Sequence, residues 1–496
     1  MCPRPATCLT ILLAVSTTAL FAQNPVATIT GQVKDSSGAA IAGAKVTAHN
    51  LDTNFERSAL TSEGADYTLP LLPIGRYEVR VEMAGFRSEL QSGITLQVDQ
   101  RARLDFVLQV GQVSETVEVS ATVPLVTSES SSIGAVVDNR KVVEMPLNSR
   151  EFYSLALLVP GVAPAAQGSL LSFRGGFNVA GASELNNNFT LNGLDNNNQL
   201  LSAPAFRPSV DAIREFKILT GTYSAENGRN SGGQVLVTLK SGTNQFHGNA
   251  FEFLRNQVLD ARNFFSPPNQ PTPSFKRNQF GGTLGGPIVK NRTFFFLSYE
   301  GLRLSEQVAQ LANVPTAEMR SGDFRSLLRL ANPIRVVNPY TGQDFSTPNV
   351  IDPAMMNNIG KALMEFYPLP TTSTPAGQLP TNNYNFNSTR NDVIDQGSMR
   401  IDHTFSAKDS INGSYNDFDN RTVDPYNIVC GSRVIPGFGC FVSLKARLAG
   451  FTETHIFSPS LINEFRIGYS QFWNPREGQD SNIDFIAQYN IPGVSF

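Results

Sequence analysis

The sequence has little of several residue types on which enzymes and nucleic-acid-binding proteins depend. Charged residues make up 16% of the 496 residues, against about 25% in an average soluble domain. The formal net charge is −3, so the chain lacks the basic field that holds a phosphate backbone, and no nucleic-acid partner is expected. Only 4 His residues are present, which leaves few general bases that work near neutral pH.

Long apolar runs and catalytic motifs are also missing. No internal stretch reaches the roughly 18 consecutive apolar residues of a transmembrane helix. Neither heptads nor a Gly triplet accompany the 41% apolar content, which excludes coiled-coil and collagen-like classes. The chain has no Gly-x-Ser-x-Gly, phosphate loop or His-Glu-x-x-His, so we expect no enzyme activity, no metal and no cofactor. A β-barrel remains open, because its signal lies in alternation rather than hydropathy.

The first 22 residues have the three-part pattern of a secretory signal. Arg4 provides positive charge, residues 9–20 are mostly apolar, and Ala22 precedes a polar pair. The alternative, a buried N-terminal helix, is disfavoured by Pro3 and Pro5. We therefore predict export and cleavage after Ala22.

Cysteine is scarce, and its distribution fits an exported chain. Of the 4 cysteines, Cys2 and Cys8 belong to the predicted signal, which leaves Cys430 and Cys440. An even pair in an oxidising compartment favours a local disulfide between them. A metal site is the weaker alternative, because no histidine lies nearby in sequence.

Short alternating runs separated by turn residues follow the signal. The runs are 27–33, 44–48, 67–69, 76–81 and 103–108, and Asp35 to Gly38 forms the first predicted turn. Short strands with frequent turns are typical of a β-sandwich, which we predict over residues 23–111.

A spaced glycine pattern runs through the same region. It comprises Gly31-x-Val33-x-Asp35-x-x-Gly38, Gly43-Ala44-x-Val46, Gly75-x-Tyr77 and Ala84-Gly85-Phe86. The pattern resembles the carboxypeptidase regulatory-like domain. Despite its name, that family implies a structural and binding module, and nothing in the sequence supports peptidase activity.

A strictly alternating segment lies in the linker expected over residues 112–123. It consists of Glu115, Thr116, Val117, Glu118, Val119, Ser120 and Ala121. The segment resembles the TonB box of outer-membrane transporters, which lends its backbone as an added strand to a periplasmic partner. A last strand of the sandwich, or a plain linker, is an equally open interpretation.

Residues 124–243 contain four landmarks in order. They are Phe173-Arg174-Gly175-Gly176, Asn192-Gly193-Leu194-Asp195, the run 210–221, and Gly232-Gly233-Gln234-Val235-Leu236-Val237-Thr238. In order and spacing they resemble the plug of TonB-dependent receptors. Arg174 and Arg214 are candidates for pairing with acidic lumen residues, or are solvated or locally paired. The loops 178–184 and 196–206 suit ligand contact, or are ordinary lumen filler.

Residues 244–496 read as membrane strands. In the run 461–473, apolar and aromatic side chains share one face, and Glu464, Arg466 and Ser470 share the other. Further strands are expected at 251–253, 293–300, 399–405 and 410–415. The turn 406–409 suits the periplasmic side, and segments near 267–274 and from about 332 to 389 suit extracellular loops.

One further motif covers the start of this region. Residues 277–287, Arg-Asn-Gln-Phe-Gly-Gly-Thr-Leu-Gly-Gly-Pro, together with Phe294-Phe295-Phe296, resemble the Oar-like branch of TonB-dependent receptors. The expected fold is mainly β: a sandwich, an α+β plug and the first part of a transmembrane antiparallel barrel. A barrel with a plug needs about 22 strands, and residues 244–496 are too few for that many strands and their loops. We therefore read the chain as an N-terminal fragment.

The resemblance implies a TonB-dependent receptor or transporter in the outer membrane. Its expected partners are outer-membrane lipid, a periplasmic TonB-type energy-coupling protein and an unidentified extracellular ligand. The alternative is an adhesion or surface-assembly protein that binds carbohydrate or protein without active transport.

Overall fold

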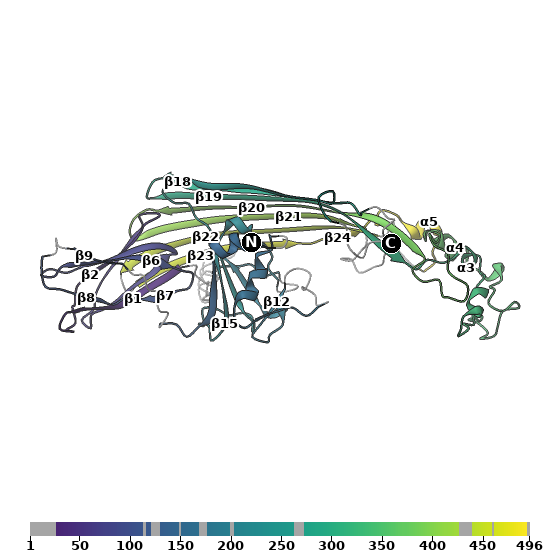
Figure 1. The fold of residues 1–496 in the computed structure, drawn as a ribbon, viewed down its shortest axis with the longest axis horizontal. Helices are drawn as coiled ribbons and strands as arrows, with labels where there is room; N and C mark the ends of the chain where they lie inside the picture. Colours follow the sequence, from purple (N-terminus) through teal and green to yellow (C-terminus); the bar gives the residue numbers. More distant parts are fainter. Residues whose placement is uncertain are drawn as a thin grey trace, which may run out of the picture.

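The computed structural model describes residues 26–112, 116–120, 129–147, 150–167, 176–198, 203–261, 272–425, 439–458 and 461–493. Strands dominate the described residues, which confirms the predicted mainly β fold. Figure 1 shows a sandwich at one end of a long curved sheet and a second small domain beneath that sheet. Among the described residues, no helix is both long and apolar enough to cross a lipid bilayer.

The N-terminal part is a sandwich of two sheets. One sheet has the order β4–β1–β7, with β8 also paired to β1, and the other has the order β3–β2–β5–β6–β9. The strands are β1 (Val26–Asp35), β2 (Lys45–Asn50), β3 (Glu56–Leu60), β4 (Asp66–Pro73), β5 (Gly75–Glu82), β6 (Ser88–Leu96), β7 (Arg101–Arg103), β8 (Phe106–Leu108) and β9 (Thr116–Ser120). Every second side chain of β5 is buried, with Tyr77, Val79 and Val81 fully inside, as alternation requires.

Local chemistry explains one correct and one wrong prediction in the sandwich. The predicted turn after β1 forms because Asp35 Oδ1 accepts hydrogen bonds from the N–H groups of Ser37 and Ala39, both at 2.8 Å. The predicted single strand 103–108 is wrong, because β7 and β8 are separate. Between them, Asp105 Oδ1 accepts a hydrogen bond from the backbone N of Gln32 at 2.8 Å, which replaces a ladder contact.

The domain beneath the curved sheet, here called the plug, comprises the described residues between 129 and 243. Its main sheet has the order β10–β15–β16–β13–β14. The elements are β10 (Ile133–Asp138), α2 (Asn139–Glu144), η2 (Phe152–Leu158), β11 (Val162–Pro164), β12 (Phe177–Val179), η4 (Glu184–Asn186), β13 (Asn188–Leu191), β14 (Leu194–Asp195), η5 (Val210–Ala212), β15 (Ile213–Gly221) and β16 (Gln234–Leu239). All six side chains of β16 are buried, so this strand is covered on both faces.

The curved sheet runs in sequence order from β17 to β23, each strand antiparallel to the next. The strands are β17 (His247–Asn256), β18 (Phe275–Val289), β19 (Thr293–Ala312), β20 (Tyr384–Thr404), β21 (Asp409–Asp424), β22 (Cys440–Ser458) and β23 (Leu461–Trp473), and β24 (Arg476–Gly478) pairs with β22. In β23, Phe465, Ile467 and Tyr469 are more than half exposed, while the Arg466 side chain is 6% exposed. The predicted division into an apolar outer face and a polar inner face is confirmed.

The long connection between β19 and β20 spans residues 313–383 and lies at the far end of the sheet from the sandwich (Figure 1). It contains α3 (Ala317–Arg320), η6 (Arg325–Arg329), η7 (Pro353–Met355) and α4 (Asn358–Met364), and α5 (Phe485–Tyr489) follows β24. The expected loop boundaries of 332 and 389 are wrong. Residues 384–389 already belong to β20, where they pair with the end of β19 despite their Asn content.

Candidate functional site

A cavity of about 430 Å³ lies between the plug and the inner face of the curved sheet. We call it the far cavity, because its β20 lining, at Arg390 and Ile394, belongs to the half of that strand distant from the sandwich. The plug contributes Phe152 and Ser209, and the sheet contributes Phe418. Concave, partly apolar sites with a few polar groups are where small ligands usually bind.

A buried charge network forms one wall of the far cavity. Glu300 on β19 accepts hydrogen bonds from Ser209 Oγ of the plug and from Gln279 Nε2 of β18, both at 2.5 Å. Arg150 of the plug places its Nε 4.0 Å from the Glu300 carboxylate and makes a close ion pair with Asp211. The side chains of Arg150, Asp211 and Glu300 are at most 15% exposed, so these charges interact with little screening by water.

Further contacts fix Arg150 and Asp211 against β17. Asn249 Nδ2 donates a hydrogen bond to Asp211 Oδ1 at 2.5 Å. The Arg150 guanidinium lies over the rings of Phe251 and Phe253, 4.4 and 4.8 Å from their centroids, within the range of a cation–π contact. The plug is thereby tied directly to β17 and β19, and to β18 through the hydrogen bond from Gln279 to Glu300.

The other arginines that line the far cavity also have carboxylate partners. Arg207 pairs with Glu151 at 2.6 Å, and Arg390 pairs with Asp392 at 3.0 Å. Each arginine of the described lining is therefore paired with a carboxylate, and amide side chains such as that of Gln396 remain to contact a ligand.

A second attachment joins the plug to the sheet through the Asn192-Gly193-Leu194-Asp195 landmark. Ideal Cβ atoms on Gly450 and Gly468 would lie 2.2 and 2.8 Å from the Leu194 side chain. These two glycines are directly opposite each other in the β22–β23 ladder. Because neither has a side chain, they leave a notch that Leu194 fills.

Hydrogen bonds flank this notch on both sides. Arg466 Nη1 donates to the Gly193 carbonyl at 3.2 Å, and Asn192 Oδ1 accepts from the backbone N of Leu239 at 3.0 Å. Asp195 pairs with Arg229 within the plug. The landmark that the sequence singled out is therefore a structural attachment point between plug and sheet.

The opposite side of the plug contacts the sandwich. Ile74 and Val98 of the sandwich form a small buried apolar cluster with Leu219 and Leu236 of the plug. Beside it, Lys217 Nζ lies 3.0 Å from an Asp99 carboxylate oxygen and donates to the Asp99 carbonyl at 2.9 Å.

Glu215 is buried in the same contact. Its carboxylate accepts a close hydrogen bond from the backbone N of Val98. Burial raises the pKa of the Glu215 carboxyl, although the Val98 N–H and the neighbouring cations act in the opposite direction. The sandwich is therefore docked on the plug by apolar, ionic and backbone contacts together.

The candidate TonB box falls partly on described residues. Thr116–Ser120 forms β9, which pairs in parallel with β6, with Val117 opposite Glu89. β9 is the last strand of that sheet among the described residues. Glu115 and Ala121, at the two ends of the candidate box, lie outside the described residues.

The remaining predicted site residues are distributed as follows. Arg174 and Cys430 lie outside the described residues, while Cys440 is disulfide-bonded. Of the two predicted ligand loops, 196–206 contributes Asn198 and the 203–205 segment to the far cavity, whereas 178–184 does not line it. Arg214 lines a different cavity, at the junction of the sandwich, plug and sheet. No group of His, Cys, Asp or Glu within the described ranges is suited to hold a metal ion.

Sequence reasoning did not identify the network around Arg150, Asp211 and Glu300. Arg150 and Asp211 are 61 residues apart, and Ser209 and Glu300 are 91 apart. Arg150 also has a positive φ of 55°, but this backbone conformation cannot be read from the sequence. No local pattern therefore predicts the network.

Two family models match the chain. The model described as an outer membrane beta barrel domain matches residues 238–496, more than half of the chain. The chain belongs to this family and is an outer-membrane protein. The model of the carboxypeptidase regulatory-like domain matches residues 28–109, which confirms the resemblance seen in the glycine pattern.

The predicted likeness to the Oar-like branch is also confirmed. The chain is 30% identical over 298 residues to the TonB-dependent transporter Oar of Myxococcus xanthus. The match covers 57% of this chain and 27% of that relative, so the chain spans about a quarter of the relative's length.

Solved structures are similar at lower identity. The outer membrane transporter YddB of Escherichia coli is 10% identical with a TM-score of 0.44, covering 69% of this chain and 39% of that one. The siderophore receptor PiuA of Acinetobacter baumannii is 13% identical with a TM-score of 0.34, covering 70% and 46%.

Proposed function

We propose that the chain is part of a TonB-dependent outer-membrane receptor that takes up an unidentified ligand through a plugged barrel. The observation that carries the proposal is the plug itself, seated on the polar inner face of the curved sheet by the Glu300 network and the Leu194 notch. A domain in this position would close the lumen of the barrel. A closed lumen can admit a ligand selectively if the plug is moved, which is how a gated transporter works. The same arrangement supports transport rather than catalysis.

The domain division that goes with this function has five parts. They are a signal at 1–22, a regulatory-like sandwich at 23–111, a linker at 112–123, a plug at 124–243 and a partial barrel at 244–496. The far cavity is the candidate ligand site, because it lies on the side of the plug away from the sandwich and is lined by both plug and barrel wall.

Energy coupling is proposed to act through the segment from Glu115 to Ala121. Since β9 ends its sheet among the described residues, one edge of its backbone can receive a strand from a periplasmic TonB-type protein. Pulling on this segment would act on the sandwich and then on the plug that follows it in the chain.

The test is a substitution in the full-length protein. Proline removes an N–H and fixes φ, so Val117→Pro should abolish energised uptake and binding of the purified periplasmic domain of the TonB-type partner. Val117→Thr is the matched control and should be nearly silent, because augmentation uses the backbone. Before this test, a growth screen of the deletion strain identifies the nutrient whose uptake is measured.

The second candidate function is adhesion or surface assembly without transport. It is favoured by the long 313–383 connection at the far end of the sheet, where Tyr340 is 89% exposed. Normal uptake by Val117→Pro, with a fully assembled protein, would contradict the coupling role of the segment. A deletion strain that shows no uptake defect but loses surface attachment would favour adhesion.

A further inference from the structure

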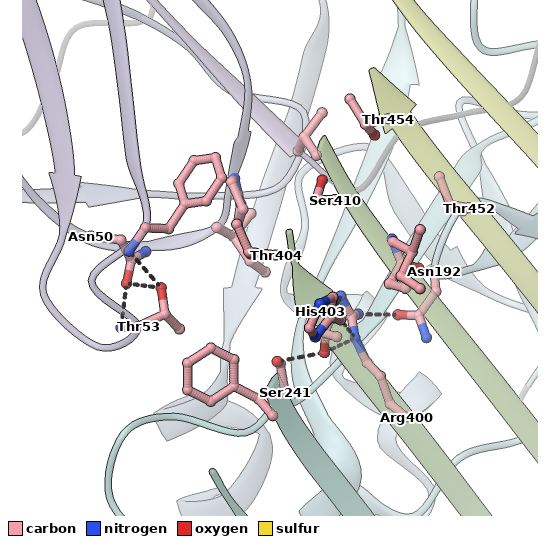
Figure 2. Close-up of a pocket in the computed structure, with 18 of the residues that line it drawn as sticks. Asn50, Thr53, Asn192, Ser241, Arg400, His403, Thr404, Ser410, Thr452 and Thr454 are labelled. Atoms are coloured by element: carbon pink, nitrogen blue, oxygen red, sulfur yellow. Dashed lines mark hydrogen bonds and ion pairs between the residues drawn. The ribbon is translucent and has the colours of Figure 1, made fainter. Parts of the chain in front are cut away.

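A second cavity, of about 150 Å³, lies where the sandwich, the plug and the curved sheet meet. We call it the junction cavity. Figure 2 shows Asn50 and Thr53 of the sandwich on one side and Ser241, Arg400 and His403 on the other. Its volume is enough for several water-sized groups, and all three parts of the molecule contribute to its wall.

The carboxylates of this cavity are already occupied by arginine partners. The pairs are Asp402–Arg400 at 2.7 Å, Glu464–Arg466 at 2.9 Å and Asp52–Arg76 at 2.5 Å. Ser241 Oγ also donates to Asp402 at 2.8 Å. Each carboxylate of the described lining is therefore already in direct contact with an arginine.

Two further arginines line the cavity without a hydrogen bond or ion pair to a described carboxylate. Arg57 Nη1 donates only to neutral acceptors, the carbonyl oxygens of Pro70 and Leu71, at 2.6 and 2.9 Å. Arg214, on β15 of the plug, has no hydrogen bond or ion pair within the part of the chain that the structure describes.

Both arginines are deeply placed. Burial lowers the pKa of Arg57 to about 10 and also lowers the pKa of Arg214. The Arg214 guanidinium reaches the sandwich, since an ideal Cβ on Gly75 would lie 3.3 Å from Arg214 Nη2. The carboxylates of Glu215 and Asp52 act on Arg214 only from a distance, without an ion-pair contact. The buried guanidinium therefore keeps part of its desolvation cost, which an anion in direct contact relieves.

Hydroxyl groups complete the lining. Thr404, Ser410 and Thr454 lie at the cavity (Figure 2), and their hydroxyls make no side-chain hydrogen bond among the described residues. Guanidinium and hydroxyl donors around a small space match the several acceptor oxygens of a tetrahedral oxyanion.

We propose that the junction cavity binds a small oxyanion of the phosphate or sulfate class, held by Arg214 of the plug with added positive charge from Arg57 of the sandwich. The anion neutralises charges contributed by both parts and stabilises their docked arrangement. Binding of this anion does not require transport, because the anion acts only on the contact between the sandwich and the plug.

The test measures unfolding of the full-length protein in detergent, in inorganic phosphate and in chloride at matched ionic strength. Phosphate at about ten times its Kd should raise the folded-to-unfolded ratio of the sandwich about tenfold over chloride. Arg214→Gln should abolish this difference. Arg80→Gln, which changes an exposed arginine of the sandwich away from the cavity lining, should preserve it.

The remaining outcomes are equally decisive. Arg214→Lys keeps the charge and should retain part of the phosphate effect, which also covers the case in which Arg214→Gln does not fold. An equal phosphate effect in Arg214→Gln, or no effect in the wild-type protein, would overturn the proposal. Stabilisation by sulfate as well as phosphate identifies tetrahedral shape as the property recognised, whereas stabilisation by phosphate alone identifies the protonated oxyanion.

Discussion

The plug is held on its two sides by different kinds of contact. Toward the curved sheet it presents the buried charges Arg150 and Asp211, which form one network with Glu300 of β19. Toward the sandwich it presents Leu219 and Leu236, which complete a four-residue apolar cluster, and Lys217, which pairs with the partly exposed Asp99. Separating buried opposite charges leaves each one uncompensated, whereas a small apolar cluster opens at a cost set by its area. The sandwich should therefore leave the plug more easily than the plug leaves the sheet.

The largest expected effect comes from breaking the network on the sheet side. Glu300→Ala leaves Arg150 without one of its two carboxylates and leaves Ser209 and Gln279 without their acceptor. We expect a loss of about 3–5 kcal/mol in the free energy of unfolding of the plug, measured by urea titration with a fluorescent label on the plug. Glu306→Ala on the same strand is the control, because Glu306 makes no side-chain hydrogen bond or ion pair among the described residues. Equal losses in both variants would contradict the network.

A smaller effect on the same side should follow from filling the notch. Gly450→Ala places a Cβ 2.2 Å from the Leu194 side chain, and overpacking of this kind costs about 1–3 kcal/mol. Gly413→Ala is the matched control, since its nearest contact would be the Gly450 carbonyl oxygen at 3.8 Å. The same urea titration checks both. A silent Gly450→Ala would mean that Leu194 does not fill this notch in solution.

On the sandwich side, the ionic contact should matter less. Lys217→Met removes the pair with Asp99, whose side chain is 27% exposed, and pairs that water can reach contribute about 1 kcal/mol or less. The readout is the rate of cross-linking between the sandwich and the plug, which should fall modestly while the urea midpoint of the plug is unchanged. A loss as large as that of Glu300→Ala would remove the contrast between the two contacts.

The smallest effect is expected from Glu215→Gln. Burial raises the pKa of the Glu215 carboxyl, so the neutral form is favoured and an amide can accept the same hydrogen bond from Val98. A raised pKa in the folded state means that this group's stability contribution is complete below its ordinary pKa of 4.5 and is lost as the pH rises through the raised value. In the wild-type protein, docking of the sandwich on the plug should weaken as the pH rises through the raised pKa of Glu215. In Glu215→Gln it should not change, as measured by cross-linking between the two domains across pH. Identical pH profiles would show that Glu215 does not titrate there.

The sequence predicted the features that depend on neighbouring residues. The Asp35 turn and the two faces of β23 follow from local hydrogen bonding and from alternation, and both are confirmed. The position of Leu194 in a landmark was visible, but its notch was not, since Gly450 and Gly468 are more than 250 residues away. The sequence around Glu300 does not predict its role, because its partners lie on β18 and on the plug, far from it in sequence. From the sequence, Arg214 is a candidate for pairing with acidic lumen residues, or is solvated or locally paired, and only the fold shows that it lies in a cavity.

The glycine notch also makes the plug sensitive to how the barrel is assembled. Gly450 lies opposite Gly468 only in the observed β22–β23 register. A slip of one residue would place Ile467 or Tyr469 opposite Gly450 and would exchange the inner and outer faces of one strand. Leu194 would then meet a side chain where it now meets empty space. We therefore expect the plug to seat only on correctly paired strands, so that its insertion depends on the β22–β23 register.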